Sequence, residues 1–276
     1  EQSPESYKKS GRASLALGKL TEAETKLRSA LRLGTQDSTV KLDLAQIYLK
    51  QKKYEKSFEL ISEFRDEISL KEDVDPKIVL KYRYTLAIGY IHRNEAKKAH
   101  RILSDIIKQY KNFTPAYIAL ISSYLRNGSL EVADYVAKKA VDRAEHTAEL
   151  YNAVGLVEER SQNLSNAEQW FNKSLNKNPD YPNALISRAR IQVKKFDYDA
   201  AEADLKKALA ISERQTNAKI LLSTVYKQRG KYKLAEALLQ SAIKEQPENA
   251  HARFNLAVLY ADFLNENKNA VRLFFE

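Results

Sequence analysis

Four alanines that recur at one fixed interval constrain the fold of this chain more than any other feature of its sequence. Ala133, Ala167, Ala201 and Ala235 stand 34 residues apart. Each lies in a similar run of residues: SLEVADYVAKKA, NLSNAEQWFNKS, DYDAAEADLKKA and KYKLAEALLQSA. Self-similarity at a period of this length is typical of stacked structural units, so the interval decides the architecture before any single residue does.

Other positions recur around these alanines, although no copy carries the whole pattern. The copy from Ala148 supplies Tyr151, Gly155, Ala167, Phe171 and Pro179. The copy from Thr216 supplies Leu222, Tyr226, Gly230, Tyr232, Ala235 and Pro247. The sequence therefore resembles the tetratricopeptide repeat family, whose helix–turn–helix unit has this period. Glu158 stands where a tyrosine is usual and Arg188 where an apolar residue is usual, departures that concern single repeats and not the array.

The resemblance implies an all-α fold, a right-handed superhelical α-solenoid of tandem helix–turn–helix repeats. Elementary physical chemistry agrees with this expectation. Glycine is favourable where a chain leaves a helix with positive φ, as predicted at Asn127-Gly128 and Arg229-Gly230. A small residue such as Ala235 suits a close helix crossing, and a large one such as Tyr226 fills the gap between neighbouring pairs. One such unit buries too little apolar surface to fold alone, whereas a stack of them can.

We expect one repeat array over the whole chain, residues 1–276. The repeats are predicted at about 4–37, 38–79, 80–113, 114–147, 148–181, 182–215, 216–249 and 250–276, the last of them truncated. Extra residues at 71–78 interrupt the interval. Asp75 followed by Pro76 is a favourable helix start, so the first helix of the third repeat is predicted to be lengthened at its N-terminus.

Composition narrows the classes of function. The chain has no cysteine, which excludes disulfides, thiolate metal sites and cysteine nucleophiles. Its four histidines have no metal-ligand spacing, and it has neither a glycine-rich phosphate loop nor a G-x-S-x-G motif. We therefore expect no catalytic, cofactor or metal site and no enzyme activity. No apolar run is long enough to cross a bilayer.

The net charge of +10 has two interpretations. It can indicate an acidic partner or an anionic surface. It can also come from lysines that solvate the outer helices, such as Lys138 and Lys206. The second interpretation is favoured, because these lysines are interleaved with acidic residues such as Asp134 and Glu202.

In the family that the chain resembles, the first helix of each pair lines a concave face. Carried over residue by residue, this implies a groove with an apolar floor and basic residues along one edge. The residues that it implies are Lys81, Tyr84, Ile88, Ile118, Ser122, Arg126, Asn152, Leu156, Arg160, Asn183, Ile186, Arg190, Lys194, Asn217, Ile220, Thr224 and Lys227. Such a groove suits a peptide or helix with apolar anchors and some acidic residues. The alternative is that Ile118, Leu156 and Ile186 mainly close the seam between repeats.

We therefore expect a non-catalytic scaffold that binds a peptide or helical segment of a partner protein and helps to assemble a larger complex. An RNA-binding helical-repeat protein is the first alternative, although the inward residues show no regular base-reading set. The second alternative is a regulatory array of an enzyme whose catalytic domain lies outside these residues.

The two ends of the chain suggest further expectations. The chain begins at Glu1 and not at a methionine, so we expect a processed N-terminus. The last copy stops within a helix and leaves Phe274 and Phe275 uncovered, so we expect either more chain beyond Glu276 or self-association through the C-terminal end. Cysteine-free arrays of this kind resemble bacterial envelope assembly proteins, and we favour the bacterial periplasm or envelope over the cytoplasm.

Overall fold

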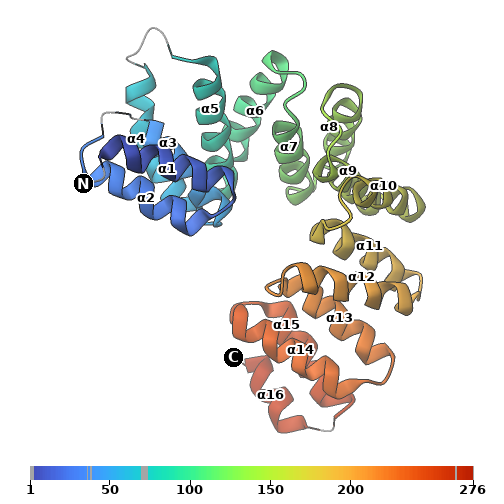
Figure 1. The fold of residues 1–276 in the computed structure, drawn as a ribbon. Helices are drawn as coiled ribbons and strands as arrows, with labels where there is room; N and C mark the ends of the chain where they lie inside the picture. The colour runs from blue at the N-terminus through green and yellow to red at the C-terminus, as the bar shows by residue number, and fades with distance from the viewer. Residues whose placement is uncertain (1–2, 36, 38, 70–73, 265, 276) are drawn as a thin grey trace. The chain divides into compact units, whose positions relative to one another are not determined.

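The computed structural model describes residues 3–35, 37, 39–69, 74–264 and 266–275, and these contain sixteen helices and no strand. They fall into two compact units. Unit 1 comprises residues up to Asn127 with Arg143–Glu145, and unit 2 comprises Gly128–Asp142 with the chain from His146 onward. The expected all-α fold of tandem helical hairpins is confirmed (Figure 1).

Unit 1 is built from hairpins in which each helix contacts the next helix of the chain. The first helices α1, α3, α5 and α7 also contact one another in order, so they form one layer, and α2, α4 and α6 form the second. The bounds are α1 (Pro4–Ala16), α2 (Leu20–Arg32), α3 (Thr39–Lys50), α4 (Tyr54–Ser69), α5 (Pro76–His92), α6 (Ala96–Gln109) and α7 (Thr114–Arg126).

Unit 2 repeats the same arrangement. The first helices α9, α11, α13 and α15 contact one another in order, and each packs against the second helix of its own hairpin. The bounds are α8 (Leu130–Arg143), α9 (Ala148–Arg160), α10 (Leu164–Lys177), α11 (Pro182–Lys194), α12 (Tyr198–Ile211), α13 (Thr216–Gln228), α14 (Tyr232–Glu245), α15 (Ala250–Asp262) and α16 (Asn267–Phe275). Helices begin at several predicted repeat starts, and we retain the division into repeats of a single array as a proposal.

The helix start predicted at Asp75 and Pro76 is confirmed. The Asp75 side chain accepts a hydrogen bond of 2.8 Å from the backbone N–H of Lys77, and Pro76 is the first residue of α5. With 17 residues, α5 is longer than α7, which has 13. Residues 71–73 of the predicted insertion lie outside the described residues. Because an aspartate cap and a proline in the first turn both favour the helical start, the extra residues lengthen this helix at its N-terminal end.

The two predicted glycine turns are also confirmed. Gly128 and Gly230 have φ of 75° and 70°, a conformation that glycine adopts without steric strain because it has no Cβ atom. At the corresponding turn between α11 and α12 stands Phe196, with φ of 62° and a side chain that is 78% exposed. A bulky residue in this region of φ is strained, so the turn geometry is imposed by the two helices that it joins and not by the residue itself.

Close crossings between helices explain the small residues of the pattern. Ala133, Ala167, Ala201 and Ala235 are all buried, as the spacing predicted. Ser57 takes the alanine position of its repeat, and its hydroxyl donates a buried hydrogen bond of 2.7 Å to the carbonyl of Ala45. This bond satisfies the extra polar group, so the substitution is compatible with burial.

Gly155 shows how close such a crossing is. A Cβ atom at this position would lie 2.5 Å from a ring carbon of Phe171 on the partner helix α10. Contacts this short do not occur, so any larger residue would force the two helices apart.

The departure from the family pattern at Arg188 is compensated locally. Its guanidinium donates two hydrogen bonds of 2.7 Å to the carboxylate of Asp204 on α12 and one of 2.8 Å to Asn172 on α10. A bidentate pair of this kind replaces apolar packing with directional bonds. At the C-terminal end, Ala270 is buried. The side chains of Phe274 and Phe275, which we expected to be uncovered, are outside the part of the chain that the structure describes.

Ala235→Leu is expected to lower the free energy of unfolding by about 1–3 kcal/mol, because a larger side chain overpacks the crossing between α13 and α14. Urea unfolding of the full chain measures the change. Ala237→Leu is the matched control, since Ala237 is exposed on the same helix, and it should change stability by about 0.5 kcal/mol or less. Equal losses in the two variants would contradict the assigned crossing.

Candidate partner-binding groove

The first helices of unit 2 form a groove with a volume of about 680 Å³. It runs over α9, α11 and α13 to the start of α15. The residues that line it are Asn152, Leu156, Asn183, Ile186, Ser187, Arg190, Gln215, Asn217, Ile220, Leu221, Thr224, Asn249 and His251. We call this surface the unit 2 groove.

Most of the groove residues predicted in this part of the chain lie in the unit 2 groove. The structure brings together Asn152, Leu156, Asn183, Ile186, Arg190, Asn217, Ile220 and Thr224. Arg160, Lys194 and Lys227 were predicted as well but are not among the lining residues. Arg160 and Lys194 are exposed in the last turns of α9 and α11, and the ammonium of Lys227 lies 5.6 Å from the ring centroid of Phe263.

Sequence reasoning missed Ser187, Gln215, Leu221, Asn249 and His251. One signal could have found His251, because it follows Asn217 at the repeat interval. Gln215 and Asn249 occupy the N-cap positions of α13 and α15. Cap residues lie just outside the helical pattern, so a search confined to inward-facing helical positions does not reach them.

The lining combines apolar side chains with uncharged polar ones. Leu156, Ile186, Ile220 and Leu221 supply the apolar surface. Asn152, Asn183, Gln215, Asn217 and Asn249 supply five carboxamides. Among the described lining residues, Arg190 is the one with a permanent formal charge. The groove can therefore bury apolar groups and exchange hydrogen bonds, and its own lining carries little charge.

Asn152 is the most deeply buried of the carboxamides. The residue is 6% exposed, and its Oδ1 atom has no hydrogen-bond partner among the described residues. A buried acceptor without a partner costs about 1–3 kcal/mol relative to one that is satisfied. It is one of four buried side-chain nitrogen or oxygen atoms without a hydrogen-bond partner among the described residues, together with Gln51 Oε1, Arg190 Nε and Gln192 Oε1.

Glu159 neutralises part of the positive charge beside the groove. It is buried near the end of α9, and its Oε1 atom lies 3.0 Å from Nε of Arg190 and 3.0 Å from Nζ of Lys194. Two cations on one carboxylate leave a net positive charge. The basic edge predicted from the sequence is thus partly neutralised by an acid of the neighbouring repeat.

The predicted groove residues of unit 1 lie in different surroundings. Lys81 forms an ion pair with Asp43, with Nζ and Oδ1 2.5 Å apart. Tyr84 is packed edge-on against Phe113, with ring centroids 5.5 Å apart, and burial raises the pKa of its phenol. Ile88 and Ile118 are half-buried, whereas Ser122 and Arg126 are exposed on α7. These residues remain proposed binding residues only.

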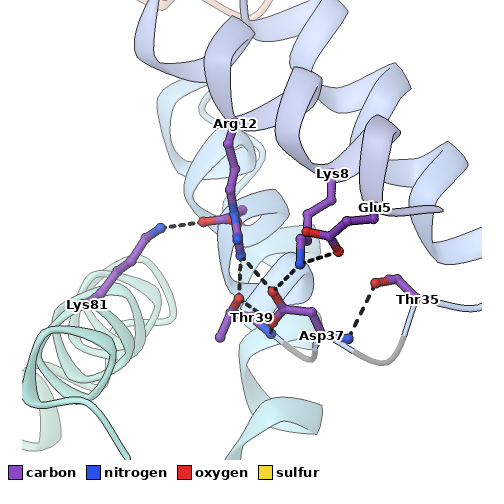
Figure 2. Close-up of polar contacts among 8 residues, drawn as sticks. Glu5, Lys8, Arg12, Thr35, Asp37, Thr39 and Lys81 are labelled. Atoms are coloured by element: carbon purple, nitrogen blue, oxygen red, sulfur yellow. Dashed lines mark hydrogen bonds and ion pairs between the residues drawn. The ribbon is translucent and has the colours of Figure 1, made fainter. Parts of the chain in front are cut away.

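A charged network joins the first helices of unit 1 (Figure 2). Asp43, buried on α3, accepts a hydrogen bond of 2.6 Å from Nε of Arg12 on α1 and also pairs with Lys81 on α5. Arg12 further contacts Asp37, at 3.3 Å, and the hydroxyl of Thr39. Three helices are therefore connected through one carboxylate, and the network shown in Figure 2 carries equal numbers of acidic and basic groups.

Asp37 lies at the centre of this network. Partial burial alone would raise the pKa of its carboxyl group. Hydrogen bonds from Thr39 and Lys8 and the charge of Arg12 outweigh that effect and lower the pKa to about 2. The network therefore depends on the ionised carboxylate.

No group of three or more histidine, aspartate or glutamate side chains among the described residues is placed to hold a metal ion. His100 Nε2 lies 2.8 Å from the hydroxyl of Ser123, but Ser123 is 2% exposed and cannot meet a substrate. None of the helices in the described parts of the chain combines the length and the apolar character that a membrane span requires.

Comparison with known proteins gives matches over most of the chain. A family model described as "Tetratricopeptide repeat" matches residues 9–68, 118–182 and 220–272. A second model with the same description matches residues 182–215. Together they match at least part of every helix of unit 2 from α9 onward.

Two curated proteins are similar in sequence. Anaphase-promoting complex subunit 3 of Schizosaccharomyces pombe is 24% identical over 157 residues, which are 56% of this chain and 23% of that protein. The BBSome complex member BBS4 homolog of Drosophila melanogaster is 26% identical over 204 residues, or 72% of this chain and 39% of that protein. The chain thus spans well under half the length of either relative.

A solved structure described as the APC/C hetero-tetramer Cut9-Hcn1 is similar in fold. The TM-score is 0.73 at 16% identity, over 93% of this chain and 49% of that one. At this identity the likeness shows the fold alone.

Asp37→Asn tests the unit 1 network through pH. Since folding lowers the pKa of Asp37 from 3.8 to about 2, its contribution is fully present above pH 3.8 and is lost as the pH falls towards 2. At neutral pH the variant should therefore be less stable by at most about 2 kcal/mol, because the group is partly solvated. Urea unfolding at a series of pH values measures this difference. A gap between the two proteins that stays constant from pH 5 to about pH 2 would contradict the assignment.

Proposed function

This chain belongs to the tetratricopeptide repeat family, and on that premise we propose that it is a non-catalytic scaffold. In this proposal the unit 2 groove binds a segment of a partner protein. The segment carries apolar anchors and at least one acidic residue, and its capture helps to assemble a larger complex.

The observation that carries the proposal is the composition of the groove. Leu156, Ile186 and Ile220 offer apolar surface on three successive first helices, and carboxamides alternate with them. Apolar contacts supply affinity, and hydrogen bonds fix the orientation of a bound chain. The net positive charge of Arg190 and Lys194 around Glu159 favours an acidic residue in the ligand.

The role in assembly is supported by the names of the relatives. Both curated proteins are named as members of complexes, an anaphase-promoting complex and a BBSome. Because the chain spans a minor part of each, the similarity extends to a repeat array and not to a complete subunit. We propose the same kind of task for this chain with a partner of its own.

The charge pattern decides which variants can test the groove. Reversing Arg190 and Lys194 to glutamate would remove both cations from the buried Glu159 and add two like charges beside it. Removing the partner of a buried charge is strongly destabilising, so a loss of binding in that variant could come from unfolding. Asn217 is a better position, since it is exposed, lines the groove and has a side chain without a hydrogen-bond partner among the described residues.

Asn217→Trp is expected to fill the groove and weaken peptide binding. The probe is a phage-displayed library of random peptides of about twelve residues, long enough to cross the groove. Enriched peptides are synthesised, and their affinity for the full chain is measured by fluorescence anisotropy. The variant should bind them at least about tenfold more weakly, because the indole occupies their site.

Asn176→Trp is the matched control, because Asn176 is exposed on the second helix α10. It should leave the affinity and the melting temperature unchanged. If no peptide is enriched, or if the enriched peptides bind Asn217→Trp as tightly as the natural chain, the unit 2 groove is not the binding site.

A further inference from the structure

We propose that unit 2 binds the surface of an anionic phospholipid bilayer through the edge at which its first helices pass into its second helices. We call this surface the turn edge. It consists of the last turns of α9, α11 and α13 with the turns that follow them, and the side chains that carry the inference are Arg160, Lys194, Phe196, Lys227 and Lys231. None of these residues lines the unit 2 groove, so the inference does not depend on the proposed function.

The three turns of this edge lie next to one another. The first helix α11 contacts both α9 and α13, and each of the three packs against its own second helix, so the connecting turns fall on one side of the stack. Contacts between hairpins agree with this. Nζ of Lys194 lies 3.0 Å from Oε1 of Glu159 in the last turn of α9. In the same way Nη1 of Arg229 lies 2.8 Å from Oε2 of Glu202 near the start of α12.

Phe196 stands at the tip of the middle turn and points to an apolar binding phase. Its side chain is 78% exposed and its φ is 62°, whereas the next turn has Gly230 at this position. Its ring lies edge-on to that of Tyr198, with centroids 6.4 Å apart. The free chain thus keeps a strained backbone and an exposed aromatic ring at one residue, and neither stabilises the fold. Strained residues are concentrated at binding sites, and a phase that takes up the ring gives this one a role.

Cations surround this ring. Arg160, Lys227 and Lys231 form no ion pair with an acidic side chain among the described residues. Lys194 shares one carboxylate with a second cation, which leaves a positive charge unbalanced. Cations in the last turn of a helix also complement the helix dipole, so their charge alone does not mark a binding surface. An exposed phenylalanine in their midst has no such role in the fold, and the two observations together indicate a ligand.

The acidic side chains of the turn edge do not cancel this charge. Asp197 accepts a hydrogen bond of 3.2 Å from the backbone N–H of Ala200 and so caps α12. Glu158 accepts one of 3.0 Å from the carboxamide of Asn163. The cations without an acid of their own outnumber these two carboxylates, so the edge keeps a net positive charge.

A bilayer fits this combination better than a protein or a nucleic acid does. A protein partner would need a preformed pocket for the ring and acidic groups in register with the cations. Single-stranded nucleic acid stacks successive bases on aromatic rings, but the turns on either side of Phe196 have Gln162 and Gly230 at its position. A bilayer takes up an apolar side chain anywhere along its interface, and its anionic headgroups attract lysine and arginine without a fixed geometry.

Phe196→Gly tests the role of the ring. The natural chain is expected to sediment at low salt with vesicles of phosphatidylcholine and phosphatidylserine, and not with vesicles of phosphatidylcholine alone. The variant should bind the anionic vesicles about tenfold more weakly, because no apolar side chain enters the interface. It should melt no lower than the natural chain, since glycine adopts a positive φ without strain. A lower melting temperature with unchanged vesicle binding would show that the ring serves the fold, and would overturn the inference.

Gln162→Gly is the matched control for the backbone. Gln162 has a φ of 63° in the neighbouring turn, so its replacement relieves the same strain without removing a ring. This variant should bind the anionic vesicles as the natural chain does.

Arg160→Gln combined with Lys231→Gln tests the charge. This double variant should bind the anionic vesicles about tenfold more weakly, because two cations no longer contact headgroups. Lys177→Gln combined with Lys244→Gln makes the same change of net charge in the last turns of α10 and α14, at the opposite end of the hairpins, and should have little effect. Equal losses in the two double variants would mean that the net charge of the chain and not the turn edge attracts the vesicles.

Insertion of the turn can be measured directly, because the chain has no cysteine and a single introduced one carries an environment-sensitive fluorophore. Attached to Phe196→Cys, the fluorophore should brighten when anionic vesicles are added, whereas attached to Asn176→Cys on α10 it should not. The inference is overturned if the natural chain does not bind the anionic vesicles, and binding of a single-stranded RNA oligomer in that case would assign the edge to nucleic acid. Asn217→Trp should bind vesicles as the natural chain does, so a failure here leaves the proposed function standing.

Discussion

The close crossing of two helices at a small residue is the contact on which the rest of this structure depends. Ala167, Ala201 and Ala235 are completely or almost completely buried at these crossings. A side chain with no atoms beyond Cβ lets the helix axes approach, and Phe171 then packs directly against Gly155 of the facing helix. Because each hairpin closes in the same way, the first helices α9, α11, α13 and α15 come to lie next to each other. The groove is a consequence of this repetition and needs no special segment of its own.

Much of the fold could be predicted from the sequence because the interval between alanines sets the helix bounds. Ala148, Pro182, Thr216 and Ala250, all predicted repeat starts, are the first residues of helices. The groove-lining residues of unit 2 could be predicted for the same reason. Ile186 and Ile220, for example, stand one repeat interval apart, and both line the groove. Gln215 and Asn249 could not be found in this way, because cap residues lie outside the helical period.

Ion pairs between neighbouring repeats could not be predicted from the repeat pattern of the sequence. Lys194 and Glu159 are 35 residues apart, and their ion pair exists only because α9 and α11 are neighbours. Arg12 and Asp43 are likewise joined by the packing of α1 on α3. Such contacts depend on side-chain rotamers at a helix interface, so a list of inward residues overstates the charge available to a ligand.

These contacts give the two units different inner surfaces. In unit 1 Asp37, Asp43 and Arg12 satisfy each other's charges. In unit 2 carboxamides such as Asn217 have no partner among the described residues, and an uncharged acceptor of Asn152 is buried without one. Removing one partner of a buried ion pair is destabilising, whereas an exposed carboxamide without a partner is available to a ligand. This difference is the reason why the binding proposal is placed on unit 2.

A crystal structure of the full chain with one library-selected peptide tests the central claim most directly. The account predicts a peptide across α9, α11 and α13, in contact with Leu156, Ile186 and Ile220. A peptide seated on the second helices would contradict it.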